Sequence, residues 1–394
     1  MFFLKKILPP YVKTFLKEEI RRIAPGESLS KNLESRIASL EHQLESRLGW
    51  SRSINNWYEP NIYEASVNLA LRDLCQPGSI VFDVGANEGW LTLLISRLVG
   101  PKGIVCAFEA NPHILDVITK NLVSNGCNNF YINHACVWKT SGEVLDFYIP
   151  PDHSQGASLY QAQYHPKEAV KTIALDDFIM SQNLEPSVVK MDIEGAEFEA
   201  LQGTKEYISR SRPHLILEQS THDGRCLDFL QNKGYLAIDL NNYRFISSIN
   251  DYPENSLIRN VLFIHRDRIE ETPYSLNLEA KHIADFSSTN FRVDNDKVFV
   301  LEDCINLNEG RYAIVIDFEA EREDNTISLA VYANNVLQVN YGGNTKWIKN
   351  SYSDFILNLD KPKSIKIEIR FIEGFDPTFN INSVSVSQVM TKSF

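Results

Sequence analysis

The stretch Ser-Ile-Val-Phe-Asp-Val-Gly-Ala-Asn-Glu-Gly-Trp, residues 79–90, decides the fold. It opens with the apolar run Ile80–Phe82, which is typical of a strand buried on both faces of a parallel sheet. Gly85, Asn87 and Gly89 follow at two-residue intervals, and an apolar helical pattern comes next. Glycines between a strand and a helix let the backbone approach a ligand near the positive end of the helix.

A second apolar run, Ile104–Phe108, ends in Glu109, where a doubly wound fold places the acid that binds ribose hydroxyls. The pattern therefore predicts a site for a nucleoside cofactor. A dinucleotide site needs a middle glycine in the turn, but Asn87 stands there. Asp83 would repel a pyrophosphate and suits a cofactor that carries a sulfonium and an ammonium. The stretch favours S-adenosylmethionine over NAD, and a ligand-free doubly wound domain is the structural alternative.

Composition limits the class of protein. A chain of 394 residues holds two domains, or one large domain with extensions. The net charge of −12 argues against a nucleic-acid partner, which requires clustered Lys and Arg. The six cysteines lack CxxC spacing, which predicts reduced core residues in a cytoplasmic protein. No stretch approaches the about 18 apolar residues of a transmembrane helix.

Residues 1–50 are predicted to form a helical extension. Within residues 1–24, six Lys and Arg and two Glu alternate with apolar residues, which leaves two alternatives. One is a membrane-surface helix, which would make the protein membrane-peripheral, and the other is a helix packed on protein. A heptad-like spacing then predicts a short coiled coil that mediates homo-oligomerisation, or else packs on the core. The residues with that spacing are Leu33, Ile37, Leu40, Leu44 and Leu48.

Residues 51–270 alternate strand and helix patterns, which predicts an α/β domain with a mostly parallel sheet joined by right-handed crossovers. The last strand is expected to run antiparallel at one side of the sheet. A single helix is expected over residues 197–209, around Gly203. The further strands are expected at Phe130–Val137, Val144–Ile149, Ser187–Met191, His214–Glu218, Tyr235–Leu240 and Asn260–Ile264.

A second polar group, Val-Lys-Met-Asp-Ile-Glu-Gly-Ala-Glu at residues 189–197, follows the fourth parallel strand, beside the first. Ligands bind in open sheets at such a switch point. Asp192 is expected to contact the methionyl part of the cofactor or to orient the acceptor. Glu194 or Glu197 can act as a general base or help hold a divalent cation, although no metal site is predicted. The alternative is a solvated loop with acids in a first helical turn.

From about Pro273 helical periodicity disappears, and seven β-rich runs follow between turn signals. Residues 275–394 are therefore predicted to form a jelly-roll-like β-sandwich. Its loops carry aromatic and amide side chains suited to sugar, which favours glycan binding, with an oligomerisation module as the alternative. These side chains are Tyr341, Asn344, Trp347 and Tyr352.

Together these motifs resemble the FkbM family of S-adenosylmethionine-dependent methyltransferases over about residues 60–265. Ala110 replaces the usual proline in the second motif, and Gly-Ala-Ser-Leu replaces Gly-x-Ser-Ser-Leu in another. The stretches that carry the resemblance are residues 82–89, 108–112, 156–159, 175–178 and 189–197.

The resemblance implies a Rossmann-like class I methyltransferase sheet of seven strands, mostly parallel. It also implies O-methylation of a sugar or glycan hydroxyl, with S-adenosyl-L-homocysteine as product. Glu109 is expected to bind the ribose, and Ala135 and Cys136 the adenine edge. The other cofactor contacts implied are Asp83, Gly85, Ala86, Asn87, Gly89, Ala110, Asn111 and Asp192.

Methyl transfer requires the hydroxyl oxygen to approach in line at about 3 Å, and a base to take its proton. The candidates for this base are Asp192, Glu194 and His222, the last of which follows the strand His214–Glu218. Two other functions remain alternatives. One is a non-catalytic methyltransferase-like binding protein with a lectin-like sandwich, and the other is an NAD-dependent oxidoreductase.

Overall fold

The chain divides into residues 1–57 and 58–394, and the computed structural model describes only parts of the second unit. The predicted N-terminal helices and coiled coil lie outside the described residues. Within the described part, no helix is long and apolar enough to cross a membrane. The described ranges are 64–149, 157–159, 167–252, 258–274, 281–294, 298–302, 304–319, 326–333, 336–344, 353–359, 361–373 and 380–390.

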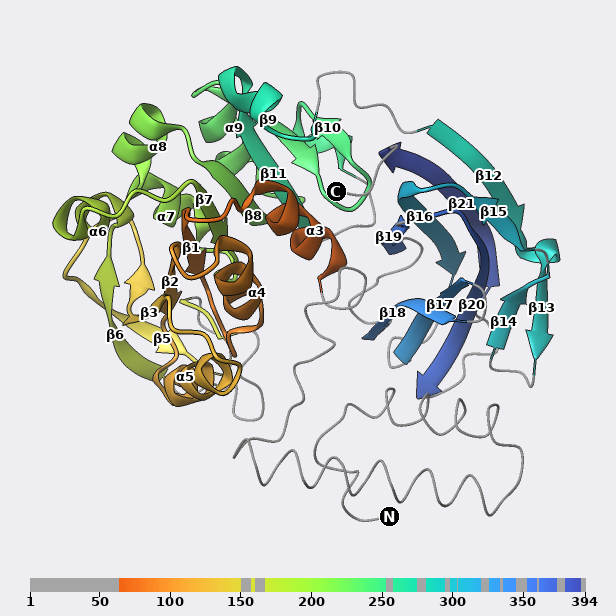
Figure 1. The fold of residues 1–394 in the computed structure, drawn as a ribbon, viewed down its shortest axis with the longest axis horizontal. Coiled ribbons are helices and arrows are strands. Elements are labelled where there is room, and N and C mark those ends of the chain that lie inside the picture. The colour runs from red at the N-terminus through yellow and green to blue at the C-terminus, as the bar shows by residue number, and fades with distance from the viewer. Residues whose placement is uncertain are drawn as a thin grey trace, which may run out of the picture. The chain divides into compact units, whose positions relative to one another are not determined.

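The large sheet has the strand order β10-β9-β11-β8-β7-β1-β2-β3 (Figure 1). The pairs β3–β2, β2–β1, β1–β7 and β7–β8 are parallel, as the alternating strands and helices predict. The sheet has eight strands among the described residues rather than seven, because a short strand, β10, pairs with β9. The bounds are β1 Ile80–Val84, β2 Ile104–Glu109, β3 Phe130–His134, β7 Val188–Met191, β8 His214–Ser220, β9 Tyr235–Asp239, β10 Arg244–Ile246 and β11 Ile258–His265.

Strand β11 is antiparallel, as predicted, but its position is different. It lies between β8 and β9 and pairs with both, instead of closing one side of the sheet. β9 precedes β11 in the chain, so the last strand returns to a place between β8 and β9. Its core residues are fully buried, as is expected of an internal strand.

The predicted strand Phe130–Val137 is divided. β3 ends at His134, and Cys136–Val137 form β4 in a separate small sheet of order β4-β6-β5. The N–H of Ala135 still donates to the carbonyl of Glu109 at 3.2 Å, after which the chain leaves β2 and pairs with β6. The other strands of this sheet are β5 Val144–Tyr148 and β6 Lys167–Ile173.

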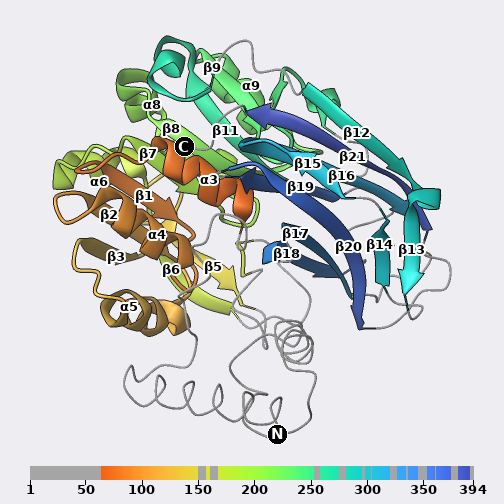
Figure 2. The ribbon, with the colours of Figure 1, turned by 45° about the vertical axis from the view of Figure 1, so that its right-hand side comes forward.

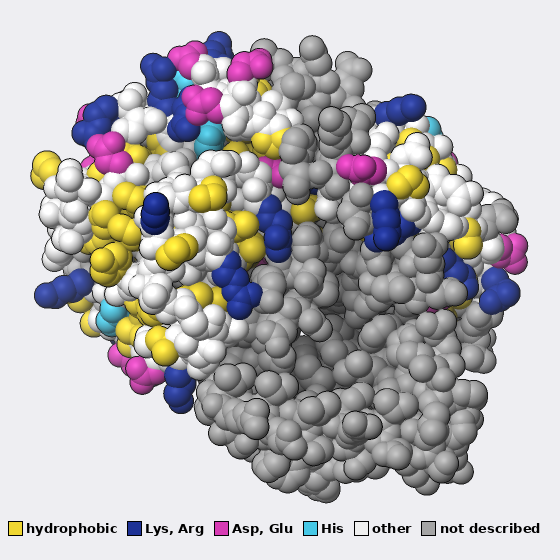
Figure 3. All heavy atoms as spheres, viewed as in Figure 1, with side chains coloured by type: hydrophobic (Ala, Val, Ile, Leu, Met, Phe, Trp, Pro, Cys, Tyr) yellow, Lys and Arg dark blue, Asp and Glu magenta, His cyan; other side chains and the backbone are white. Residues whose placement is uncertain are grey.

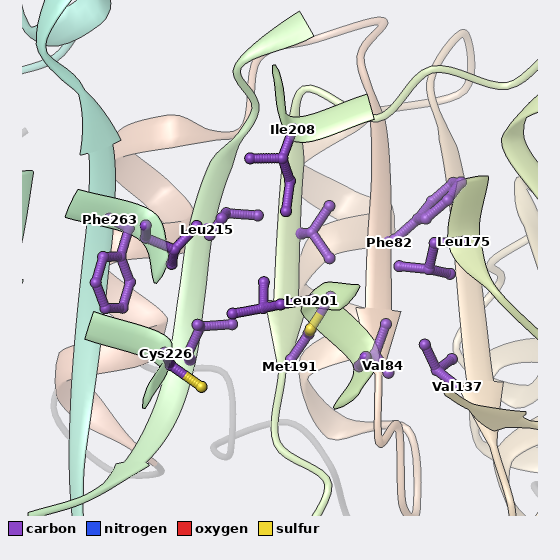
Figure 4. Close-up of a cluster of buried hydrophobic side chains, with 14 of the residues drawn as sticks. Phe82, Val84, Val137, Leu175, Met191, Leu201, Ile208, Leu215, Cys226 and Phe263 are labelled. Carbon is purple, nitrogen blue, oxygen red and sulfur yellow. The ribbon is translucent and has the colours of Figure 1, made fainter. Parts of the chain in front are cut away.

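Helices cover both faces of the large sheet. Val81 belongs to a buried cluster that includes residues of α3 and α4, and the next residue, Phe82, to a cluster that includes residues of α6 to α9. Figure 4 shows the second cluster, with Leu201 and Ile208 among the strand side chains. The helix bounds are α3 Ala65–Leu74, α4 Trp90–Val99, α5 Leu115–Ser124, α6 Leu175–Gln182, α7 Glu197–Gln202, α8 Lys205–Ser211 and α9 Arg225–Gln231.

The helix predicted over residues 197–209 is two helices, α7 and α8, which meet at Gly203. A Cβ atom at Gly203 would lie 2.1 Å from the carbonyl oxygen of Trp138. The glycine therefore allows close contact between backbones at the point where the helix breaks.

The described residues of 281–390 form two antiparallel sheets (Figure 2). One has the order β12-β21-β16-β19, the other β13-β14-β20-β17-β18 with β15 on β20, and one buried cluster contains side chains of both. The seven predicted strands are present, and β12, β13 and β15 were not predicted. The bounds are β12 Lys281–Ser287, β13 Phe291–Asp294, β14 Val298–Leu301, β15 Ile305–Leu307, β16 Gly310–Glu319, β17 Thr326–Ala333, β18 Val336–Asn344, β19 Ser353–Leu359, β20 Lys363–Glu373 and β21 Asn380–Met390.

A buried ion pair joins helix α3 to strand β16. The guanidinium of Arg311 donates to both carboxylate oxygens of Asp73, at 2.8 and 3.0 Å, and to the hydroxyl of Tyr243 at 2.9 Å. The hydroxyl of Tyr274 donates to Asp73 at 2.7 Å. Both side chains of the ion pair are fully buried. A bidentate pair with this many hydrogen bonds fixes the geometry between the two elements.

We expect Arg311→Met to destabilise the protein strongly, because it leaves the Asp73 carboxylate buried without a cation. Loss of one partner of a buried pair costs about 3–5 kcal/mol. The measurement is chemical denaturation of the full chain. The control is Arg210→Met, which breaks a pair with Glu185 at 2.6 Å between side chains 64% and 55% exposed. Such a surface pair contributes about 0–1 kcal/mol. Equal losses in the two variants would contradict the role given to Arg311.

Candidate active site at the carboxyl ends of strands β1, β2, β7 and β8

The turn after β1 is held between the ends of two neighbouring strands. The N–H groups of Gly85 and Ala86 donate to the carbonyl of Phe108 at 3.0 and 3.1 Å. Gly85 has φ 78°, and a Cβ atom there would lie 1.8 Å from the carbonyl oxygen of Asp192. Because no side chain fits that space, the turn requires glycine at this position.

The carboxylate of Glu109 connects this turn to the end of β2. It accepts from the N–H of Asn87 at 2.8 Å and from that of Asn111 at 2.7 Å, one bond on each oxygen. Glu109 is buried, and burial raises the pKa of its carboxyl while the two N–H bonds oppose that rise. Glu109, which is predicted to bind the ribose, therefore holds the turn. Each of its carboxylate oxygens keeps a second lone pair that can accept from a hydroxyl.

A buried lysine, Lys190, lies at the centre of the site. Its ammonium donates to the carbonyl of Gly85 at 3.3 Å, and lies 3.5 Å from an oxygen of Asp192 and 3.8 Å from one of Asp83. Burial acts to lower the pKa of Lys190, but the charges of Asp192 and Asp83 outweigh burial and raise it. Lys190 is therefore a fixed positive charge that joins β1, β7 and the turn.

Asp83, predicted as a cofactor contact, is fully buried. It accepts from the hydroxyl of Thr92 in α4 at 2.5 Å. Burial raises the pKa of Asp83, and Lys190 and Thr92 oppose that rise. The charge of Asp192 adds to the rise, and Lys190, 3.8 Å from Asp83, is the cation that offsets it.

The loop after β7 wraps around another buried carboxylate, Glu197. It accepts from the N–H of Ile193 at 2.8 Å and from that of Gly195 at 3.4 Å, and burial raises its pKa to about 7. Glu194, a predicted base, is exposed, with φ 54°. The loop thus separates the roles of its acids, because Glu197 shapes the backbone while Asp192 contacts Lys190.

The structure brings a carboxylate into the site that the sequence analysis did not select. β7 and β8 pair in parallel with Met191 opposite Leu217, so the next residues, Asp192 and Glu218, stand at the same level. Burial and the charge of Asp192 raise the pKa of Glu218 to about 9. The available signal was that an apolar strand ends in an acid here, as it does before Asp192.

The remaining predicted residues lie on two sides of this centre. Cys136 is buried, and burial together with the charge of Glu109 raises the pKa of its thiol to about 12. It packs in a small cluster with Ala110 and with Ala157 of the Gly-Ala-Ser-Leu motif. Ala135 precedes it, next to the end of β2. His222 is exposed in the loop after β8, where its N–H donates to the hydroxyl of Ser220 at 3.3 Å.

Three contiguous residues of the turn, Ala86, Asn87 and Glu88, lead to Gly89, which is buried against Ile118 and directly precedes α4. Among the described residues, no group of three or more His, Cys, Asp or Glu side chains is arranged to hold a metal ion.

Comparison with known proteins shows which proteins part of this chain is similar to. The family model described as "Methyltransferase FkbM domain" matches residues 83–237. The hexuronic acid methyltransferase AglP of Haloferax volcanii is 29% identical over 141 residues, which are 36% of this chain and 56% of the relative. The tRNA (adenine(58)-N(1))-methyltransferase TrmI of Thermus thermophilus is 42% identical over 59 residues, 15% of this chain and 23% of that one. The chain thus spans about half the length of the first of these relatives and about a quarter of the second.

Among solved structures, a methyltransferase FkbM from Methylobacillus flagellatus is similar with a TM-score of 0.31 and 17% identity. The match covers 47% of this chain and 43% of that one.

We expect the pH dependence of stability to report the buried carboxyl of Glu197. Its pKa is raised from 4.5 to about 7 on folding, so the folded state binds more protons than the unfolded state between these values. The free energy of unfolding therefore falls as pH rises through that window. Glu197→Gln, which keeps an acceptor oxygen but cannot titrate, should remove about 1–3 kcal/mol of this fall.

The measurement is urea denaturation at a series of pH values from mildly acidic to neutral. The exposed Glu206 supplies the matched control, Glu206→Gln, which should keep the slope of the unchanged protein. If Glu197→Gln keeps that slope as well, the assignment of a raised pKa to Glu197 is wrong.

Proposed function

We propose, on the premise that residues 83–237 belong to the methyltransferase FkbM family, that the protein is an S-adenosylmethionine-dependent O-methyltransferase acting on a hydroxyl of a sugar or glycan. The observation that carries the proposal is the geometry of Glu109. An acid at the end of β2 that also holds the glycine turn after β1 stands where a nucleoside's ribose is bound in doubly wound folds.

The donor's two ends have different partners in this proposal. Glu109 accepts the ribose hydroxyls, and Ala110, Ala135 and Cys136 border the adenine. Asp192, whose side chain is 26% exposed, faces the methionyl part together with the turn residues. Asp83 has no exposed surface, so it acts from beneath by holding Lys190 and the turn rather than by direct contact.

A hydroxyl acceptor on a sugar is supported by the name of one relative and by observations that argue against a nucleic-acid acceptor. The relative from Haloferax volcanii is named a hexuronic acid methyltransferase. A nucleic-acid acceptor, which the name of the Thermus thermophilus relative brings up, is disfavoured by the net charge of −12. On the face drawn in Figure 3, Lys and Arg side chains are spread singly or in pairs, with Asp and Glu among them. The described residues on this face form no basic stripe of the kind that phosphate binding needs.

When bound, the donor supplies an electrophilic methyl group. The chain's own part is to position the acceptor oxygen in line with that group and to take the hydroxyl proton. Asp192 is suited to orienting the acceptor, because its negative charge is already paired with Lys190. Glu194 and His222, two of the bases predicted from the sequence, both follow strands at this edge.

We further propose that residues 275–394 form a jelly-roll-like β-sandwich that contacts glycan or mediates oligomerisation. Two antiparallel sheets that share one buried cluster support the architecture. Of the residues predicted to bind sugar, Tyr341 and Asn344 lie in strand β18, and Trp347 and Tyr352 lie outside the described residues. A cytoplasmic location agrees with six cysteines that form no disulfide.

The proposal is tested by methyl transfer from labelled S-adenosylmethionine to a panel of sugars, nucleotide sugars and lipid-linked oligosaccharides, with and without EDTA. We expect label in a sugar acceptor, and the same rate in both conditions. A calorimetric titration with the donor that gives no heat would favour the non-catalytic binding protein. Fluorescence quenching by NADH without binding of S-adenosylhomocysteine would favour the oxidoreductase.

We expect Glu109→Gln to weaken donor binding by about 1–3 kcal/mol, because it removes the charge from the hydrogen bonds to the ribose and the turn. Calorimetric titration with S-adenosylhomocysteine measures the change. Glu143→Gln is the matched control, because Glu143 is exposed beside the small sheet. Unchanged affinity in Glu109→Gln would show that the ribose is not bound at β2.

A further inference from the structure

Strand pairing places Glu218 beside Asp192 on one face of the sheet. Lys190 lies opposite Ile216 in the parallel pair β7–β8, and the residue two positions along each strand returns to the same face. The ion pair between Asp192 and Lys190 confirms that Asp192 does so. Neighbouring strands are about 4.8 Å apart, so the two carboxyl groups are within mutual influence.

The charges that face Glu218 are mainly negative. Four carboxylates act on it through their charges. Three come from the loop after β7 and the start of α7, namely Asp192, Glu194 and Glu197, and the fourth is Glu64, directly before α3. Lys190 is a described cation on this face, and it is paired with Asp192 and Asp83. β11, on the other side of β8, places the uncharged Asn260 opposite Glu218.

This environment favours a neutral Glu218 in the cofactor-free protein. Burial and the four surrounding carboxylates raise its pKa to about 9. A cation that binds at the ends of β1 and β7 stabilises the carboxylate form and lowers that pKa. S-adenosylmethionine carries a sulfonium, whereas S-adenosylhomocysteine carries an uncharged thioether in its place. The two ligands therefore affect Glu218 differently.

Resting on the function proposed above, we propose that Glu218 is the general base: it releases its proton to solvent when the cationic donor binds and then takes the proton of the acceptor hydroxyl. In the transfer step, the acceptor oxygen forms a bond to the methyl carbon as the sulfur–methyl bond breaks. The bonding electron pair goes to sulfur and the hydroxyl proton goes to the Glu218 carboxylate. The products are the methyl ether, S-adenosylhomocysteine and protonated Glu218, which is the form the empty site favours.

The test measures proton release on ligand binding, which needs no acceptor. The full chain is titrated near neutral pH with S-adenosylmethionine and with S-adenosylhomocysteine, in two buffers of different ionisation enthalpy. The difference in heat between buffers gives the number of protons released. We expect binding of S-adenosylmethionine to release more protons than binding of S-adenosylhomocysteine. The variant Glu218→Gln should still bind both ligands but show no such difference. Glu143→Gln, at an exposed residue that directly precedes β5, should keep the difference.

The possible outcomes distinguish a failure of the proposed function from a failure of the role proposed for Glu218. No heat with either ligand in the unchanged protein would refute the proposed function itself. Binding of both ligands with equal proton release, or an unchanged difference in Glu218→Gln, would overturn the role of Glu218 alone. With a sugar acceptor from the panel, Glu218→Gln should lower kcat by about 10²–10⁴-fold. The rise of kcat with pH should disappear in that variant.

Discussion

The buried ammonium of Lys190 is the interaction on which the rest of the site depends. A charge taken out of water costs several kcal/mol, about as much as a small domain's net stability, unless it is paired and hydrogen-bonded. Here Asp83, Asp192 and the carbonyl of Gly85 surround it. Because these groups come from β1, from the loop after β7 and from the turn, the same ammonium fixes all three relative to one another.

That arrangement also bears on which cofactor fits. In a dinucleotide site the N–H groups at the start of the helix bind a pyrophosphate. In this chain the N–H of Asn87 is already bonded to Glu109, and Asp83 and Asp192 bring negative charge to the neighbouring strand ends. An edge with more carboxylates than ammonium groups attracts a cation and repels a phosphate. The positive charge of a bound sulfonium therefore interacts with the carboxylates of this edge. This interaction is the basis of the role proposed for Glu218.

The parallel sheet and the residues of the turn after its first strand could be predicted from the sequence, because they depend on local patterns. The strand–turn–helix of residues 79–90 and the acid after Ile104–Phe108 are short-range features, and their order fixes a parallel sheet. The sequence patterns do not select Glu218, because its proximity to Asp192 comes from the register between β7 and β8, which periodicity within one strand does not give. The division of Phe130–Val137 between two sheets depends likewise on pairing partners. Arg311 and Asp73 are 238 residues apart, and nothing in either neighbourhood marks the pair.

The central claim is that an adenosyl donor lies across the ends of β1 and β2, with its ribose on Glu109 and its amino-acid end beside the turn at Gly85. The most direct measurement is a crystal structure of the full chain with S-adenosylhomocysteine. The account predicts ribose oxygens within hydrogen-bond distance of the Glu109 carboxylate and the homocysteine end near Gly85 and Asp192. Ligand density elsewhere on the chain, or an empty edge at saturating ligand, would contradict it.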